Sequence, residues 1–383
     1  MSGRLETADL LTADVREAAA RWLGSRDDDA LARIAWAVLV EPGDGVAGGA
    51  IGQLGARDAL DLVASPGGAG TTVAQAVERW RTRWDPRLLL SAIAAADRKD
   101  MRLVTPSSAE WPRPLDDLGP HAPVALWVRG DPALLPSSPS VGVVGARAVT
   151  PYGEHATADI VNELAETGIA IVSGAAYGVD GIAHRAALRV GGTTVAFLAG
   201  GADRVYPAGH ANLLAQIAET GAVAAECAPG TTPTRWRFLA RNRLIAALSD
   251  ATLIVEAGAR SGSINTAGHA AALGRPLGAV PGPITSSTSA GCHRVLREYD
   301  ATCITGAADV REMLGDVVAG RAREFESTEA VRVADALTRR RARSVEEIAQ
   351  RSGMAVDDVV AALGILLLEG RAAERADGWV SAV

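Results

Sequence analysis

The sequence is poor in the residues that build disulfide frameworks, metal clusters and aromatic surfaces. Its three cysteines, Cys227, Cys292 and Cys303, are odd in number and far apart, which suits a reducing cytoplasm better than a disulfide scaffold. The histidines are scattered without metal-ligand spacing, so no metal site is expected. Aromatic residues make up only 4% of the chain and Lys99 is its only lysine, so arginine supplies nearly all of the positive charge.

Long apolar runs and cofactor motifs are missing as well. No run approaches membrane-spanning length, and the first residues, MSGRLETADLL, lack the hydrophobic core of a signal peptide. The first strand of the main domain is followed by Gly142-x-x-Gly145 instead of G-x-G-x-x-G, and Lys99 precedes Asp rather than the Ser or Thr of a Walker A loop. The G-x-S-x-G elbow does not surround any serine at a strand end. These absences predict a cytoplasmic protein without membrane contact, cofactor or catalytic residue.

What the chain does contain is enough to bury large cores. It has 383 residues, of which 48% are hydrophobic and 22% charged, so two or three domains are expected. The net charge of −7 argues mildly against a generic nucleic-acid binder. Net charge is an average, however, and a local basic patch can survive it.

Helical spacing of apolar residues predicts a small helical domain over residues 1–85. Glycine-rich breaks such as GDGVAGGAIG (43–52) separate its helices. The motif PGGAGT (66–71) resembles a nucleotide motif of lysine-decarboxylase-like phosphoribohydrolases, the LOG family, but Ala74 stands where that motif has Glu. Residues 66–71 are therefore predicted to be an inter-helix loop. The helices are expected over 14–23, 30–40, 56–64 and 73–81.

Strands and helices alternate within a second domain, predicted over residues 86–306. It begins with a proline-rich stretch (100–135) that holds two brief strand-like pieces and is expected to be a connector packed against the sheet. Continuous apolar strands, each followed by a helix, predict a parallel sheet covered on both faces. The fold class is α/β, an extended Rossmann-like doubly wound sheet in which ligands bind beyond the carboxyl ends of the strands. The strands are expected over 141–144, 169–172, 194–199, 222–226, 251–257 and 277–282.

The end of the chain is predicted to be a linker (307–328) followed by a winged-helix domain (329–383). The second helix of that domain, near 355–369, carries Asp357, Asp358 and Glu369 and no basic residue. A recognition helix in a major groove normally uses basic or amide side chains. Binding of a protein partner or self-association is therefore favoured over base readout, and the arginines at 339–341 leave backbone binding open.

Glycine-rich turns follow the strands at one end of the predicted sheet. Glycines let backbone N–H groups approach an anion, and helix N-termini favour negative charge. Local turn chemistry explains each turn by itself, but several at one sheet edge predict an anion-binding rim. The rim residues are Gly145, Arg147, Ser173, Gly174, Gly200, Gly201, Ser261, Gly262 and Ser263.

An arginine-rich segment indicates which anion the rim binds. In RWRFLARNR (235–243) four arginines are interleaved with Trp236 and Phe238, and no acid intervenes. Taken by itself, this segment is also explained by a solvated helix face with two buried aromatic residues. Beside the rim it is typical of single-stranded nucleic acid, because arginines neutralise phosphates while aromatic rings stack on unpaired bases. About four phosphate contacts predict a log–log salt slope of roughly −3. The phosphate contacts are predicted for Arg147, Arg235, Arg237, Arg241 and Arg243.

The same segments resemble DNA-processing protein A, the DprA/Smf family. The resemblance covers nearly the whole chain, including the helical N-terminal and winged C-terminal parts. The quoted motifs keep the order and spacing of that family. They are VGVVGARAVTPYG (141–153), VSGAAYGVDGIAHRAAL (172–188), GGADRVYPAGHANL (200–213) and ARNRLIAALSDATLIVEAGARSGSINTAGHAAALGR (240–275).

This resemblance implies a homodimer that binds single-stranded DNA, protects incoming strands and loads the recombinase RecA onto them during natural transformation, with no known catalysis. One departure is Tyr177, where the family often has a small or basic residue, so a basic contact at that position is in doubt. Carried over by motif, the DNA pocket contains Gly145, Arg147, Gly200, Gly201, Arg241, Asn242 and Arg243.

An enzymatic alternative stays open. EAGARSGSINTA (256–267) occupies a strand-end position similar to that of the nucleotide motif of the LOG family, so a phosphoribohydrolase-like enzyme is the second hypothesis. Asp180 and His184 lie four residues apart on one helix and can form an acid–base pair. A helix-capping Asp and a hydrogen-bonded packing His explain them as well. Glu256 ends a strand near the rim, where it can order arginines or backbone.

Overall fold

The computed structural model describes residues 5–65, 70–135, 139–315, 328–368, 370–375 and 377–382. The chain divides into two compact units, Met1–Val317 and Val318–Val383. Four residues of the loop predicted at 66–71, and Glu369, lie outside the described residues.

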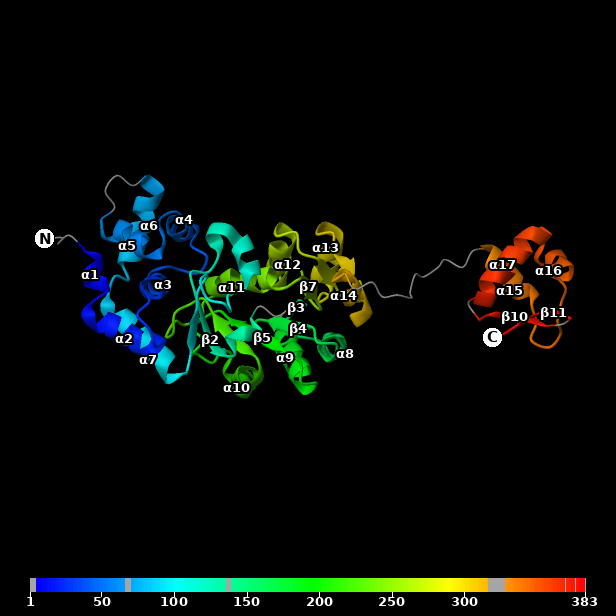
Figure 1. Cartoon of the computed structure of the whole chain (residues 1–383), viewed down its shortest axis with the longest axis horizontal. Helices are drawn as coiled ribbons and strands as arrows, with labels where there is room; N and C mark the ends of the chain where they lie inside the picture. Colours follow the sequence, from blue (N-terminus) through cyan, green and yellow to red (C-terminus); the bar gives the residue numbers. More distant parts are fainter. Residues whose placement is uncertain are drawn as a thin grey trace. The chain divides into compact units, whose positions relative to one another are not determined.

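Helices α1 to α7 open the first unit (Figure 1). Polar caps explain where several of them begin, because a side-chain oxygen accepts a hydrogen bond from a free backbone N–H of the first turn. Thr12 caps α2, Asp27 caps α3 and Asp85 caps α7. The bounds are α1 (Thr7–Leu10), α2 (Ala13–Leu23), α3 (Asp28–Leu39), α4 (Gly45–Leu54), α5 (Ala56–Ala64), α6 (Thr71–Arg81) and α7 (Pro86–Arg98).

Helix α4 corrects one expectation. The glycine-rich segment 43–52 is predicted to break the helices, yet most of it is helical, with Asp44 as its cap. Glycine is unfavourable in helices, but here it allows α4 to lie close to the segment around Pro120 and His121. A Cβ on Gly48 would lie 1.9 Å from the Pro120 carbonyl oxygen, and one on Gly45 would lie 2.5 Å from the His121 ring. Close packing therefore outweighs helix propensity in this segment.

A nine-stranded sheet follows the helices, with strand order β1-β2-β6-β5-β4-β3-β7-β8-β9. In this order, all neighbouring strands from β6 through β5, β4, β3, β7 and β8 to β9 pair in parallel, as predicted. At the other end, β1 pairs antiparallel with β2, and β2 pairs antiparallel with β6. The stretch 100–135 is thus no mere connector, because its two strand-like pieces extend the sheet. The bounds are β1 (Arg102–Val104), β2 (Leu126–Gly130), β3 (Ser140–Val144), β4 (Ala170–Ser173), β5 (Thr194–Leu198), β6 (Ala222–Ala225), β7 (Ala251–Ile254), β8 (Leu277–Ala279) and β9 (Thr302–Cys303).

Helices cover both faces of this sheet. Helices α11, α12 and α13 share a core with one face, and α8, α9 and α14 share a core with the other. Between the strands lie short 3₁₀ segments η1 (Arg113–His121), η2 (Pro132–Leu134) and η3 (Ala208–His210). The helix bounds are α8 (Pro151–Glu166), α9 (Val179–Arg189), α10 (Ala211–Thr220), α11 (Arg235–Leu248), α12 (Ser263–Ala272), α13 (Ala290–Glu298) and α14 (Ala307–Met313).

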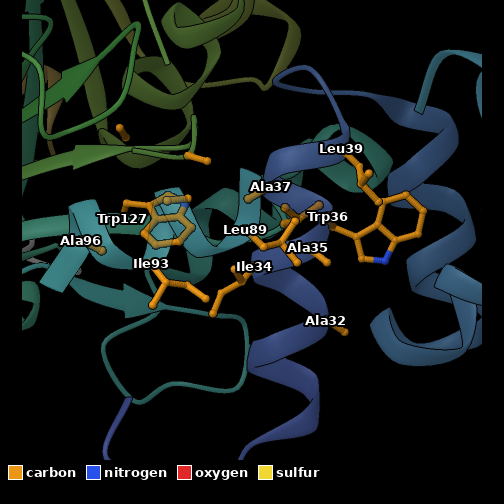
Figure 2. Close-up of a cluster of buried hydrophobic side chains, with 14 of the residues drawn as sticks. Ala32, Ile34, Ala35, Trp36, Ala37, Leu39, Leu89, Ile93, Ala96 and Trp127 are labelled. Atoms are coloured by element: carbon orange, nitrogen blue, oxygen red, sulfur yellow. The ribbon is translucent and has the colours of Figure 1, made fainter. Parts of the chain in front are cut away.

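The N-terminal helices and the sheet share one core. Figure 2 shows Trp127 of β2 among side chains of α3 and α7, including Ile34, Leu89 and Ile93. The Trp127 ring also stacks on Trp22, with centroids 5.4 Å apart. The boundary predicted at 85/86 therefore lies inside a single packed unit.

Helix α14 extends this unit into the segment predicted to be a linker. Ala307 and Val310 are buried in the core beside α8. Arg311 forms a 2.9 Å ion pair with Glu163 of that helix. Residues 307–315 thus belong to the first unit, and 316–327 lie outside the described residues.

The second unit has the helices and paired strands of a winged helix. Its core contains Val333, Ile348, Val359 and Leu363. The Ser344 side chain accepts a hydrogen bond from Glu347 N–H and so caps α16. The elements are α15 (Thr328–Ala336), α16 (Val345–Ser352), α17 (Val356–Leu368), β10 (Ala372–Arg375) and β11 (Gly378–Ser381).

Candidate nucleic-acid interface

A groove of about 970 Å³ lies at the point in the sheet where the order of the strands along the chain reverses, between β3 and β7. Strands β3 and β7 are neighbours, but α8 follows β3 on one face and α12 follows β7 on the other. Helices that diverge in this way leave a crevice at the carboxyl ends of the two strands, where doubly wound sheets bind ligands. The predicted site residues that line the groove are Gly145, Arg147, Arg235, Phe238, Arg241, Asn242, Ser261, Gly262 and Ser263.

Arg147 lies on one wall of the groove with its guanidinium over the Phe238 ring. The Cζ atom is 4.5 Å from the ring centroid, and the Arg147 side chain is exposed. Stacking holds a guanidinium in place without using its N–H donors. Arg235, at the N-terminus of α11, is exposed on the same groove. Both cations are thus placed to meet an anionic ligand.

Arg241 and Asp180 form the floor. Arg241 is buried, donates to the Phe197 carbonyl and lies against the backbone of Gly174, where a Cβ would fall 2.0 Å from Arg241 Nη1. Burial lowers the pKa of Arg241 to about 10, with Asp180 opposing the shift. Burial also raises the pKa of Asp180, against the attraction of Arg241. Gly174 therefore serves the site by making room for a buried cation.

The opposite wall is the N-terminal end of α12. Asn242 of α11 donates to the Gly262 carbonyl at 3.2 Å and so ties the two helices together. The hydroxyl groups of Ser261 and Ser263 lie 2.7 Å apart, and Ser261 Oγ also accepts from Ser263 N–H. These contacts fix a polar helix end beside the cations, a favourable arrangement for a phosphate.

Arg237 and Arg243 do not line the groove. Arg237 forms a two-pronged ion pair with Glu41, at 2.9 and 2.7 Å, on the far side of α11. Burial raises the pKa of Glu41, but hydrogen bonds from Arg237 and Arg83 outweigh it and hold that pKa below its usual value. Arg243 is buried and donates to Glu226 at 2.8 Å. Both guanidiniums are thus neutralised within the fold, so the predicted phosphate contacts of Arg237 and Arg243 have no geometric support.

Three other rim residues contribute to packing rather than to the groove lining. Ser173 is buried and donates to the Val143 carbonyl at 2.6 Å. Gly200 borders a separate cavity of about 10 Å³, and a Cβ on it would lie 2.7 Å from the Thr231 oxygen. Gly201 donates its own N–H to that same carbonyl at 2.9 Å. These residues fix the loop beside the groove, and Gly174 borders the same small cavity as Gly200.

Glu256 holds the turn after β3. Its carboxylate accepts from Thr150 N–H and from the Thr150 hydroxyl, each at 2.9 Å. Its carbonyl accepts from Ala146 N–H at 2.6 Å. One carboxylate oxygen thus orders backbone, which is one of the two roles expected from the sequence, and the other holds the hydroxyl of Thr150, the residue that caps α8.

His184 is a buried packing residue. Thr194 donates its hydroxyl hydrogen to the Ile171 carbonyl, so Thr194 Oγ1 accepts from His184 Nδ1–H at 2.7 Å. The other ring nitrogen, Nε2, is buried without a partner. Burial, and then the positive charge of Arg241, lowers the pKa of His184 to about 3. Asp180 accepts from Ala176 N–H near the start of α9, so Asp180 and His184 have separate structural roles.

Two exposed side chains in the groove lining are among the residues that the sequence prediction missed. Tyr206 and Arg260 both line the groove and are exposed. Each follows a strand within a quoted glycine-rich turn, at RVYP and GARSG, so the rule that ligands bind at strand ends would have found them.

The winged helix has a different surface. The exposed side chains of α17 include Asp357 and Asp358 and a set of apolar residues. That composition suits a contact with protein better than a contact with phosphates. Binding of a protein partner by the winged helix stays a prediction. The large exposed apolar side chains are Val356, Val360, Ile365, Leu367 and Leu368.

Two kinds of feature are absent from the described part of the chain. Nowhere in it do three or more His, Cys, Asp or Glu side chains gather in a group that could hold a metal ion. None of its helices has both the length and the apolar character needed to cross a membrane.

Comparison with known proteins finds consistent similarities along the chain. A family model described as DNA recombination-mediator protein A matches residues 102–315, and one described as the DprA winged helix domain matches 319–378. A putative DNA processing protein DprA of Mycobacterium tuberculosis is 45% identical over 305 residues, which are 74% of this chain and 77% of that protein. DprA of Bacillus subtilis is 33% identical over 229 residues, or 60% and 75%.

Solved structures give the same picture. DprA of Streptococcus pneumoniae superposes with a TM-score of 0.62 at 30% identity, covering 75% of this chain and 97% of that one. DNA processing protein A of Helicobacter pylori superposes with a TM-score of 0.51 at 32% identity, covering 56% and 95%. The Helicobacter structure concerns a single-stranded DNA binding mode.

Proposed function

Because this chain belongs to the DNA-processing protein A family, the DprA/Smf family, we propose that it binds single-stranded DNA in the groove between β3, β7 and α11. One observation carries the proposal. Exposed cations and a polar helix end line one groove of about 970 Å³, at the switch point of the sheet. The single-strand binding of the Helicobacter relative supports the same assignment.

We infer different tasks for the arginines. Arg147 and Arg235 line the groove and are exposed, so we expect both to meet phosphates, and Arg241 adds charge from the floor. Phe238 positions Arg147. With Arg237 and Arg243 neutralised by carboxylates, about three contacts remain, and the expected salt slope falls from roughly −3 to roughly −2.

The finer parts of the proposal rest on family membership. We expect the protein to act in the cytoplasm as a homodimer that protects incoming single strands and loads RecA onto them during natural transformation or recombination. Sedimentation analysis tests the dimer. The rate at which RecA hydrolyses ATP on strands covered by single-strand binding protein, with and without this chain, tests the loading.

Replacing Arg147 with alanine is expected to weaken binding of a single-stranded oligonucleotide about tenfold and to reduce the steepness of the salt slope by about 0.7. The physical reason is the loss of one phosphate contact. Fluorescence anisotropy over a salt series measures both quantities. Arg189→Ala is the matched control, because Arg189 is exposed at the far end of α9 and does not line the groove. Equal slopes for the wild type and Arg147→Ala would remove Arg147 from the site.

Deletion of residues 326–383 separates this proposal from duplex recognition by the winged helix. The first unit is compact by itself and has its own cores, so the shortened chain is expected to keep its single-strand affinity. Loss of all DNA binding would instead place the interface on the second unit.

The phosphoribohydrolase alternative predicts release of free base from nucleoside monophosphates, abolished by Glu256→Gln. Because both carboxylate oxygens of Glu256 are engaged by Thr150, we expect no base release above background. Chromatography of the reaction mixture checks this. Base release by the wild type that Glu256→Gln abolishes would favour the enzyme instead.

A further inference from the structure

Exposed tyrosines gather beside the groove. Of the four tyrosines, Tyr152, Tyr177 and Tyr206 are about half exposed, whereas large aromatics such as Trp36 and Trp127 are fully buried. Two of the exposed rings, Tyr177 and Tyr206, come from loops that border the groove. In a chain with only 4% aromatic residues, this placement is not explained by core packing.

Tyr206, Phe238 and Arg147 contact one another in sequence, with Phe238 in the middle. Its ring lies 5.4 Å from the Phe238 ring, and Phe238 carries the Arg147 guanidinium at 4.5 Å. Tyr206 lines the groove, yet 46% of its surface is exposed. Next to the phosphate-binding cation there is thus an aromatic surface that is open to solvent.

Tyr177 lies on the turn that packs against Arg147. Its neighbour Ala176 lines the groove. On its other side Gly178 adopts a φ of 79° and lies so close to the 146–147 turn that a Cβ would be 2.1 Å from the Ala146 oxygen. Tyr177 is therefore held within a residue or two of the groove, on the backbone that buttresses Arg147.

The two tyrosine loops are joined to each other. The Tyr177 hydroxyl accepts from Gly209 N–H at 3.3 Å. Its ring meets His210 edge-on, with centroids 4.8 Å apart. Gly209 and His210 follow Tyr206 in the same loop, so one hydrogen bond and one ring contact tie Tyr177 to the loop that carries Tyr206. The polar tip of Tyr177 is engaged, while 51% of the residue remains exposed.

We propose that Tyr206 and Tyr177 form a ledge on which unpaired bases stack as the strand leaves the groove past Arg147. This inference rests on the proposed single-strand binding and adds the contact with the bases. Aromatic rings stack on any base, because every base has a π-face, so the ledge is tolerant of sequence. Paired bases in a duplex expose only their edges along the grooves, so the ledge selects single strands.

Two DNA ligands with the same number of phosphates test the ledge. One is an oligothymidylate, and the other is an abasic oligonucleotide of equal length. Tyr206→Ala and Tyr177→Ala are each expected to lower the affinity for oligothymidylate about tenfold. Both variants are expected to leave the affinity for the abasic strand and the salt slope unchanged. Tyr206→Phe and Tyr177→Phe are expected to retain binding, because the ring face is kept. Tyr152→Ala is the matched control, since Tyr152 is 47% exposed but its hydroxyl donates to the Pro281 carbonyl away from the groove lining.

A second readout is the fluorescence of 2-aminopurine placed along the strand. Stacking on a ring quenches it, and at least one position is expected to brighten in Tyr206→Ala relative to the wild type.

The outcomes separate the ledge from the groove. If both alanine variants bind oligothymidylate as the wild type does while Arg147→Ala still weakens binding, the ledge is wrong and the groove stands. If the alanine variants lose affinity for both strands equally, the rings support the backbone site rather than bases, which also overturns the ledge. If the wild type binds neither strand, the proposed function fails and the ledge with it.

Discussion

Replacing Arg243 with methionine is expected to lower the free energy of unfolding of the first unit by about 3–5 kcal/mol, although Arg243 does not line the groove. The substitution leaves the Glu226 carboxylate buried without its cation, since the two side chains are only 7% and 9% exposed. It also removes the hydrogen bonds that Arg243 donates to the His121 and Ala240 carbonyls, at 3.0 and 2.9 Å.

Urea unfolding followed by tryptophan fluorescence measures the effect, because Trp36, Trp80 and Trp127 are buried in this unit. The matched control is Arg294→Ala, whose partner Glu298 is 44% exposed, and its expected effect is only about 0–1 kcal/mol.

A double variant separates charge from packing. Combining Arg243→Met with Glu226→Gln removes the buried charge while an amide oxygen can still accept from Gly43 N–H, which donates to Glu226 at 2.9 Å in the wild type. We expect the double variant to be more stable than Arg243→Met alone. A double variant as unstable as the single one would show that lost packing, not the unpaired carboxylate, dominates.

His184 is expected to make the first unit less stable as the pH falls from about 6.5 toward 3. Burial lowers the pKa of His184 from 6.5 to about 3, so between these values the unfolded chain binds a proton that the folded chain does not. Stability from this group is complete above the unfolded pKa and is lost as the pH falls. The largest loss, near pH 3, is up to about 5 kcal/mol at 1.36 kcal/mol per pKa unit.

His184→Asn tests this link, because the asparagine amide can replace Nδ1 as donor to Thr194. The variant is expected to be less stable than the wild type at pH 7, owing to the space that it leaves, but to show a flatter decline of stability down to pH 5. Urea unfolding at several pH values gives both curves. His155→Gln, at an exposed position of α8, serves as control and is expected to keep the wild-type slope. An unchanged slope in His184→Asn would assign the acid sensitivity to other groups.

The strands of the parallel sheet could be predicted because each is a local apolar run. Runs such as VGVV and TVAFL need no distant information to be recognised as buried strands. Strands β1 and β2 could not be placed in the same way. They are three and five residues long; β1 pairs antiparallel with β2, and β2 pairs antiparallel with β6, and only the assembled sheet defines these pairings.

The arginines of α11 show where the sequence stops being informative. All four look alike in RWRFLARNR, and the spacing suggests four phosphate ligands. Arg237 instead meets Glu41, which lies 196 residues earlier, and Arg243 meets Glu226. Partners that lie 196 and 17 residues away leave no pattern within the segment itself, so only the folded chain separates the arginines that support the fold from those that face the groove.

The clamp between Glu256 and Thr150 bears on the kinetics of association. It joins the turn after β3 to the end of β7, so the two segments that follow these strands are already held together before a DNA strand arrives. The loss of conformational entropy on binding then falls mainly on the polynucleotide. Encounter is expected to be governed by diffusion and the local electric field rather than by reordering of the protein.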